Sequence, residues 1–158
     1  MNIKQILAAQ GIYSAEHHLH NDVTWYGDGG SGTLAENLTR IQLTAGIGEA
    51  FSAGEQIYGG TEIEGGNPAR YVDFHSILVT AVSAANNLYV LQLIGGAGVI
   101  GDGTIMTHYS GFFPATGKAG PIYSSCRKVP CNFKIWIKTK CETDGATIDI
   151  MVGPHIYP

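Results

Sequence analysis

The sequence of 158 residues has few charged side chains, and basic ones are the scarcest. Charged residues make up 14% of the chain, whereas about 25% is typical of a soluble domain. Nine lysines and arginines stand against thirteen aspartates and glutamates, and this acidic balance argues against nucleic-acid binding, which needs a basic surface. No run approaches the roughly 18 apolar residues of a membrane helix. We therefore expect neither a nucleic acid nor a membrane as a partner.

Cysteine is also scarce, with Cys126, Cys131 and Cys141 only. An odd number of cysteines is typical of free thiols in a reducing compartment, although a bridge from Cys126 to Cys131 around Pro130 is an alternative. The cysteines are followed by no histidine before His155, which does not match a zinc site. Residues 1–11 lack the apolar run of a secretory signal. We expect synthesis in the cytoplasm, with no metal and no cofactor.

Hydrophobic residues, at 44%, and 22 glycines are plentiful instead. This apolar content excludes disorder because it requires a core, and the length fits one ordinary domain. Charge is unevenly distributed: residues 1–117 hold three basic and ten acidic side chains, whereas residues 118–158 hold six and three. Regions of opposite sign can orient identical subunits against one another. We therefore expect a homo-oligomer.

The first 37 residues differ in character from the rest. Residues 2–10 predict a short helix that Asn2 caps, that Gly11 ends, and whose apolar face consists of Ile3, Ile6 and Leu7. About nine residues are too few for a stable isolated helix, so this helix must dock on another surface. The following residues are polar and glycine-rich, and residues 27–32 predict a flexible loop. We predict a helix and extended arm over residues 1–37, followed by a β domain over residues 38–158.

The rest of the chain predicts short strands separated by glycine and proline turns. No internal helix interrupts them, and residues 110–131 have the composition of a loop. This pattern is typical of an all-β antiparallel sandwich, for which a jelly roll is our first choice. The expected strands before the loop are residues 40–44, 56–64, 71–82, 88–94 and 104–109.

Two alternating segments near the end, residues 133–141 and 147–152, flank Asp144-Gly145. Asp-Gly is a strong signal for a two-residue hairpin turn, so we predict that these strands pair with each other. Counting outward from the turn gives a register that places all the aliphatic side chains on one face. The pairs are Cys141 with Ile148, Thr139 with Ile150, Ile137 with Val152, and Lys140 with Asp149 on the other face.

Catalytic motifs are weak in this sequence. Residues 96–101 fit the spacing of a dinucleotide-binding glycine loop, but turn and strand residues follow, and no acidic residue lies about twenty positions on. The serines lack a nucleophile elbow, and the acids are scattered apart from Glu62 and Glu64. We predict no enzyme activity. The cluster of His17, His18 and His20 is left open as a metal site, a pH-sensitive contact or a solvated loop.

Exposed aromatics are the best candidates for contact with a partner. The hairpin register points Trp136 outward between Lys134 and Lys138, where it anchors an interface unless a loop or the lysine stems cover it. A sugar-binding platform built on Trp25, Tyr26 or Trp136 is the alternative use. The full set of predicted interface residues is Ile3, Ile6, Leu7, Trp25, Tyr26, Phe112, Phe113, Trp136, Ile156 and Tyr157.

The overall plan resembles that of the small jelly-roll capsid cement, or decoration, proteins of tailed bacteriophages. The resemblance covers the short N-terminal helix, the glycine-rich arm, the low-charge β body and the closing strand DIMVGPHIYP of residues 149–158. It implies a non-catalytic virion protein that binds the major capsid protein and copies of itself, and stabilises the phage head through its arm and loops. The alternative is a carbohydrate- or receptor-binding β-sandwich module of a phage tail or fibre.

Overall fold

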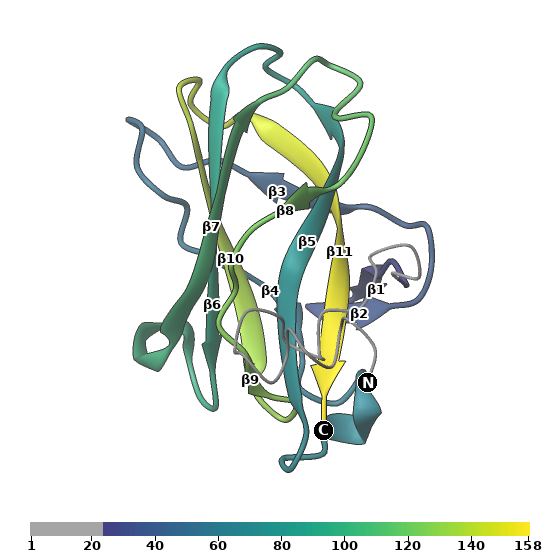
Figure 1. Ribbon diagram of the computed structural model, residues 1–158. Helices are drawn as coiled ribbons and strands as arrows, with labels where there is room; N and C mark the ends of the chain where they lie inside the picture. Colours follow the sequence, from purple (N-terminus) through teal and green to yellow (C-terminus); the bar gives the residue numbers. More distant parts are fainter. Residues whose placement is uncertain (1–23) are drawn as a thin grey trace, which may run out of the picture.

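The computed structural model describes residues 24–158. The predicted helix with Ile3, Ile6 and Leu7 lies outside the described residues, as do the three histidines at positions 17, 18 and 20. The described chain is built from strands (Figure 1). In order they are Gly27–Gly30 (β1), Thr33–Ala35 (β2), Ile41–Thr44 (β3), Glu55–Tyr58 (β4), Tyr71–Val82 (β5), Leu88–Gly96 (β6), Thr104–Phe112 (β7), Ile122–Tyr123 (β8), Val129–Pro130 (β9), Lys134–Cys141 (β10) and Thr147–Tyr157 (β11).

Strands β3 to β11 form two antiparallel sheets that face each other as a sandwich (Figure 1), and β1 and β2 form a separate two-stranded sheet. One sheet has the order β3-β11-β5-β8, with β9 also paired to β5, and the other has the order β4-β10-β6-β7. The early strands of the body thus pair with the late ones in reverse order: β3 with β11, β4 with β10, β5 with β8 and β9, and β6 with β7. This is the strand order of a jelly roll, so the predicted fold class is confirmed.

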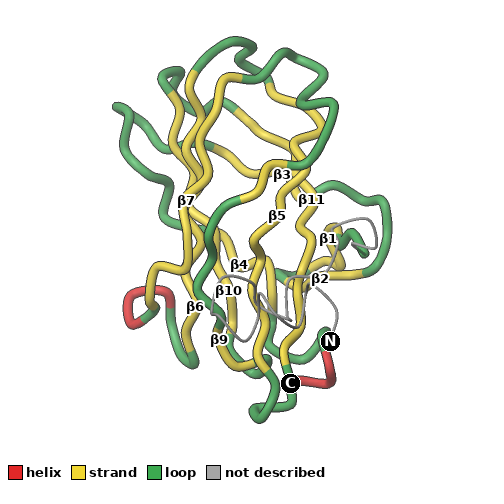
Figure 2. The backbone as a smooth tube through the Cα atoms, viewed as in Figure 1, coloured by secondary structure: helices red, strands yellow, loops and turns green. Residues whose placement is uncertain are grey.

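Helix is almost absent from the described residues. The helical segments among residues 24–158 are the 3₁₀ turns Glu64–Gly66 (η2) and Ile100–Asp102 (η3), drawn in red in Figure 2. The second turn lies in the connection from β6 to β7 and overlaps the end of the glycine loop of residues 96–101. A dinucleotide site needs an α-helix there, because the helix N-terminus binds the pyrophosphate. The interpretation of that segment as a connecting loop is therefore confirmed.

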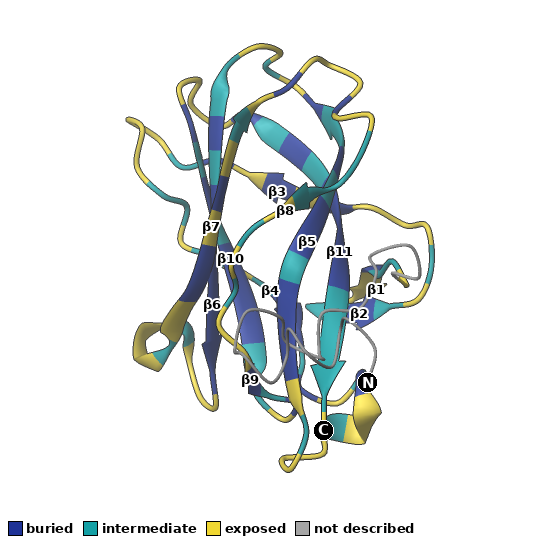
Figure 3. Ribbon diagram, viewed as in Figure 1, coloured by how far each residue is buried: buried dark blue, intermediate teal, exposed yellow. Residues whose placement is uncertain are grey.

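The core lies between the two sheets, and its side chains alternate inward along each strand. In Figure 3 buried residues concentrate in the strands of both sheets, whereas exposed residues gather in the connecting loops. Buried tyrosines direct their hydroxyls to main-chain carbonyls: Tyr58 donates to Cys131 O at 2.5 Å and Tyr109 donates to Phe74 O at 2.5 Å. Burial raises the pKa of both tyrosines. Their hydroxyls are thus protonated donors inside the sandwich.

The predicted hairpin of the last two long strands is wrong, although both strands exist. Strand β10 pairs with β6 and β4, and β11 pairs with β5 and β3. Ile137 therefore lies opposite Leu93 in β6, and Lys140 lies opposite Val90 and does not pair with Asp149. The Asp144-Gly145 turn carries the chain from one sheet to the other. Both strands point their aliphatic side chains inward, and two strands show this pattern whether they pair within one sheet or face each other across the core. The pattern therefore could not distinguish the two arrangements.

The prediction of a flexible loop over residues 27–32 of the arm is also wrong. Residues 27–35 form a β-hairpin of β1 and β2, whose turn has left-handed backbone at Gly30, Ser31 and Gly32, with φ of 86°, 55° and 74°. Leu34 of β2 is 4% exposed and belongs to the core. Tyr26 exchanges two main-chain hydrogen bonds with Val152 of β11, at 2.9 and 3.0 Å. This hairpin is anchored on the body, whereas the domain boundary at residue 37 stays a prediction.

Candidate functional site

The structure divides the predicted interface residues into three groups. Phe112, at the end of β7, is 64% exposed, as an interface residue should be. Phe113 and Trp136 are 4% and 7% exposed, so their assignment to an interface is wrong. The remaining described members are partly buried, namely Trp25, Tyr26, Ile156 and Tyr157.

Phe113 is buried because neighbouring residues at a strand end point in opposite directions. Its ring lies 6.3 Å from the ring of Tyr89, centroid to centroid, and both belong to the core. Phe112 lies opposite Leu88 at the end of the β6–β7 pairing and points outward. The sequence analysis assigned both phenylalanines to an interface, but only Phe112 is exposed, whereas Phe113 belongs to the core.

Trp136 does point to the outer face of its sheet, because Ile135 and Ile137 on either side belong to the core. The loop between β6 and β7 folds back over this face. A side chain on Gly103 of that loop would overlap Ile94, the residue opposite Trp136 in β6. Gly96 lies beside the indole ring, since a Cβ there would be in ordinary contact, at 3.7 Å, with its Cζ3 atom. Trp136 is thus a buried residue of the outer face, outside the core cluster, and the structure supports the expectation of a covered tryptophan.

Four loops meet at one end of the sandwich, which we call the loop end: residues 45–54, 83–87, 113–121 and 142–146. Hydrogen bonds connect them to one another and to the adjoining strand ends, so the loops support each other. This end carries the exposed Phe112 and Ile47, the latter 79% exposed. The bonds are Gly48 N–H to Asp144 Oδ1 at 2.7 Å, Asn86 N–H to Phe113 O at 2.8 Å, Leu88 N–H to Glu142 Oε2 at 2.8 Å and Thr143 Oγ1 to Asn87 Oδ1 at 3.1 Å.

A cluster of an acid, two histidines and a tyrosine lies on the outer face of the other sheet. Asp73 and His75 belong to β5 and point away from the core, because Val72 and Phe74 point into it. His155 of β11 lies directly opposite Asp73 in the strand register, and Tyr157 follows two residues later. The cluster therefore depends on the pairing of β5 with β11.

The geometry of this cluster centres on Asp73, which is only 3% exposed. Its Oδ1 lies 2.5 Å from His75 Nδ1, and its Oδ2 accepts a 2.6 Å hydrogen bond from the Tyr157 hydroxyl. The His155 ring is 5.3 Å from the His75 ring and 4.4 Å from the Tyr157 ring, centroid to centroid. One ligand atom from each of Asp73, His75 and His155 lies within 4.8 Å of the other two.

The sequence prediction missed this cluster for a structural reason. The spacing of Asp73 and His75 puts both on one face of a strand, and that signal is visible in the sequence. Their contact with His155 needs the β5–β11 register, whereas the sequence pattern assigned β11 to β10. Local spacing therefore places Asp73 and His75 together, and only the tertiary pairing of β5 with β11 adds His155.

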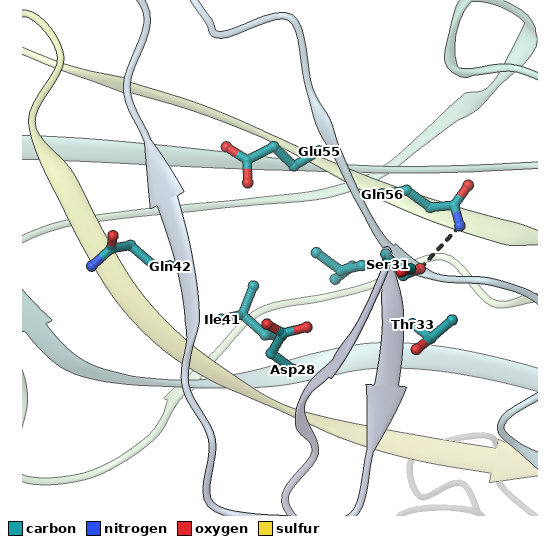
Figure 4. Close-up of a pocket in the computed structure, with 9 residues that line it drawn as sticks. Asp28, Ser31, Thr33, Ile41, Gln42, Glu55 and Gln56 are labelled. Carbon is teal, nitrogen blue, oxygen red and sulfur yellow. Dashed lines mark hydrogen bonds between the residues drawn. The ribbon is translucent and has the colours of Figure 1, made fainter.

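A polar hollow lies where the edge strands β3 and β4 of the two sheets approach the β1–β2 hairpin (Figure 4). Its volume is about 200 Å³, and Gln56 Nε2 donates to Gly32 O at 2.9 Å on its rim. This is smaller than the roughly 300–1,000 Å³ of a drug-sized ligand site. The lining is mostly polar and consists of Asp28, Ser31, Gly32, Thr33, Ile41, Gln42, Glu55, Gln56 and Ile57.

The other candidate groups from the sequence have structural roles. Glu62 Oε1 accepts hydrogen bonds from the N–H groups of Gly59 and Leu34, at 2.7 and 3.0 Å, which fixes the β1–β2 hairpin to the body. All three cysteines lie among the described residues and are free thiols. Burial raises the pKa of Cys126 to about 12 and also raises that of Cys131. Neither thiol is a reactive thiolate at neutral pH.

No protein-family model matches this chain, and no curated protein is similar to it in sequence. Within residues 24–158, no helix has the length and hydrophobicity that crossing a bilayer would require.

Proposed function

We propose that this protein is a virion structural protein, a capsid cement or decoration protein that stabilises a phage head lattice without catalysis. Its partners are the major capsid protein and further copies of itself, and it resides in the virion after synthesis in the host cytoplasm. The observation that carries the proposal is the loop end, a braced set of loops that exposes Phe112 and Ile47 on a jelly-roll body.

Three physical features support an assembly role. Jelly rolls serve in viral capsids as well as in lectins and cupins, so the fold alone does not choose among them. Few charges cover this surface, with 14% charged residues, which lowers the desolvation cost of burying wide contacts. The hydrogen bonds between loops pre-order the loop end, so less conformational entropy is lost when a partner covers it.

The test uses heads of the virus that encodes the chain, assembled without it, and the purified protein. Co-sedimentation at increasing concentration gives the affinity. We expect the wild type to bind at saturating stoichiometry and Phe112→Ala to weaken binding at least about tenfold. Leu38→Ala is the matched control, because Leu38 is 86% exposed but lies in the β2–β3 connection, outside the loop end. Absence of wild-type binding would refute the proposed function. Equal effects of the two variants on the affinity would refute the proposal that the loop end is the binding surface.

A deletion variant tests the contribution of the N-terminal part of the predicted arm to attachment. Removal of residues 1–23 keeps every described strand, including the β1–β2 hairpin. We expect a folded protein with the thermal midpoint of the full chain to within a few degrees, and weaker binding to heads. Unchanged affinity would show that the arm does not contribute to attachment.

Carbohydrate binding is the second candidate, and the polar hollow favours it. Its two carboxylates and two amides are the donors and acceptors that sugar hydroxyls need, and half-buried Trp25 provides an aromatic nearby in the sequence. A glycan panel is the test, with Glu55→Gln as the variant and Glu49→Gln, an exposed loop residue, as control. A glycan hit that only Glu55→Gln abolishes would support this function, and an empty panel would refute it.

A further inference from the structure

We propose that Asp73, His75 and His155 form a binding site for one zinc-class transition-metal ion on the outer face of the β5–β11 pair. The site is independent of the proposed virion function and of the loop end. It lies near one end of the β5–β11 pair, and its ligands come from two strands far apart in sequence.

The strand register brings the three ligand atoms together. His155 is opposite Asp73, and His75 is two residues further along β5 on the same face. One ligand atom of each residue lies within 4.8 Å of the others. Ligand atoms around tetrahedral zinc are about 3.4 Å apart, given metal–ligand distances of about 2.1 Å. A bound ion would require side-chain rotations that lengthen the 2.5 Å contact between Asp73 Oδ1 and His75 Nδ1, with no change of strand pairing.

The chemistry of the donors selects the metal. Two imidazoles and one carboxylate suit Zn²⁺, Co²⁺ and Ni²⁺, whereas Mg²⁺ and Ca²⁺ prefer oxygen ligands only. Asp73 is 3% exposed, and a buried carboxylate requires a compensating charge. A divalent cation bound to Asp73 would supply that charge. The Tyr157 hydroxyl, bonded to Asp73 Oδ2 at 2.6 Å, orients the carboxylate in the way that outer partners of metal sites do.

The competing explanation is a simple Asp73–His75 pair that helps β5 to pack. Their 2.5 Å contact is that of a hydrogen-bonded pair, whereas two ligand atoms of one zinc ion would lie about 3.4 Å apart. His155 distinguishes the two, because the metal site requires it as a ligand, whereas the Asp73–His75 pair does not require it. Lys128 also distinguishes them, since its ammonium lies 4.6 Å from the centre of the Tyr157 ring. Its positive charge opposes a bound cation, so its removal should strengthen metal binding.

The decisive experiment titrates the tag-free full chain with Co²⁺ and Zn²⁺. Calorimetry should give one ion per chain, and the Co²⁺ complex should show visible absorption bands that Zn²⁺ abolishes. We expect His155→Ala and His75→Ala to lose the site. His108→Ala is the matched control, because His108 is an exposed histidine on β7 whose Nε2 bonds Gln92 at 2.8 Å. A second control replaces the three histidines at 17, 18 and 20 with alanine, and should still bind.

Two milder variants cover the case in which an alanine variant does not fold, as judged by its circular dichroism. Tyr157→Phe should keep the fold and weaken the affinity about 10–100-fold. Lys128→Gln should keep the fold and tighten binding. No stoichiometric Co²⁺ or Zn²⁺ binding by the wild type overturns the proposal. Loss of binding in the control variants, or unchanged binding in Tyr157→Phe together with His155→Ala, overturns it as well.

Discussion

Replacement of Trp136 by alanine separates a structural tryptophan from an interface anchor. The residue is 7% exposed, and the loop between β6 and β7 folds back over its face of the sheet. Truncating a buried tryptophan typically costs about 3–5 kcal/mol, because the lost contacts and the remaining cavity add together. Single domains have unfolding free energies of about 5–15 kcal/mol. Trp136→Ala should therefore fold, with a large part of its stability removed.

Urea unfolding followed by circular dichroism at 25 °C measures this cost. With a slope of about 2 kcal/mol per molar urea, a loss of 3–5 kcal/mol lowers the midpoint by about 1.5–2.5 M. Phe112→Ala is the control, since its side chain is 64% exposed and exposed substitutions stay within about 0.5 kcal/mol. A loss below about 1 kcal/mol for Trp136→Ala would refute its structural role. Reduced binding of the folded Trp136→Ala variant to heads would instead show that Trp136 contributes to the interface.

Two further predictions test the backbone and the thiols. Gly117 has a φ of 77°, and a Cβ there would overlap the Val79 carbonyl oxygen, so Gly117→Ala should lower the thermal midpoint by several degrees, since about 1 kcal/mol shifts it by about 2–4 °C. Gly98→Ala should leave the midpoint unchanged, because nothing lies within 4 Å of its Cβ. The pKa of Cys126 rises from 9.0 to about 12 mainly through burial, so its thiolate is about a thousandfold scarcer. Iodoacetamide at pH 8 should label Cys126 far more slowly in the native protein than in urea, and equal rates would contradict its burial.

The long strands of this fold were predictable because alternation along one strand is a local property. Strand β5 spans Tyr71–Val82 as predicted, and β10 and β11 begin within a residue of their expected positions. The jelly-roll class followed from short strands, turn residues and loops. The short strands β8 and β9 lie in the segment predicted as a loop, because two residues each are too few to show a pattern.

The pairing of strands and the burial of individual side chains were not predictable, because both depend on segments that are distant in the sequence. The register counted from Asp144-Gly145 satisfied the hydrophobic pattern and one charge pair, yet the turn joins two sheets. Trp136 lies on the outer face as its alternation indicates, yet it is 7% exposed, and the β6–β7 loop lies over the neighbouring Ile94. Glu62 gives no sequence signal for fixing the β1–β2 hairpin, since its bond to Leu34 N–H spans 28 positions.

The position of β11 connects the correction of the fold to the candidate metal site. If β11 paired with β10, as the Asp-Gly turn suggests locally, His155 would not lie beside β5 and no third ligand would reach Asp73. With β11 between β3 and β5, His155 lies opposite Asp73. A metal bound by both residues would link the two strands and stabilise the folded state in proportion to its concentration. A chelator should then lower the thermal midpoint of the wild type and leave that of His155→Ala unchanged. Equal responses of the two proteins would refute the claim that a metal bound by His155 stabilises the β5–β11 pair.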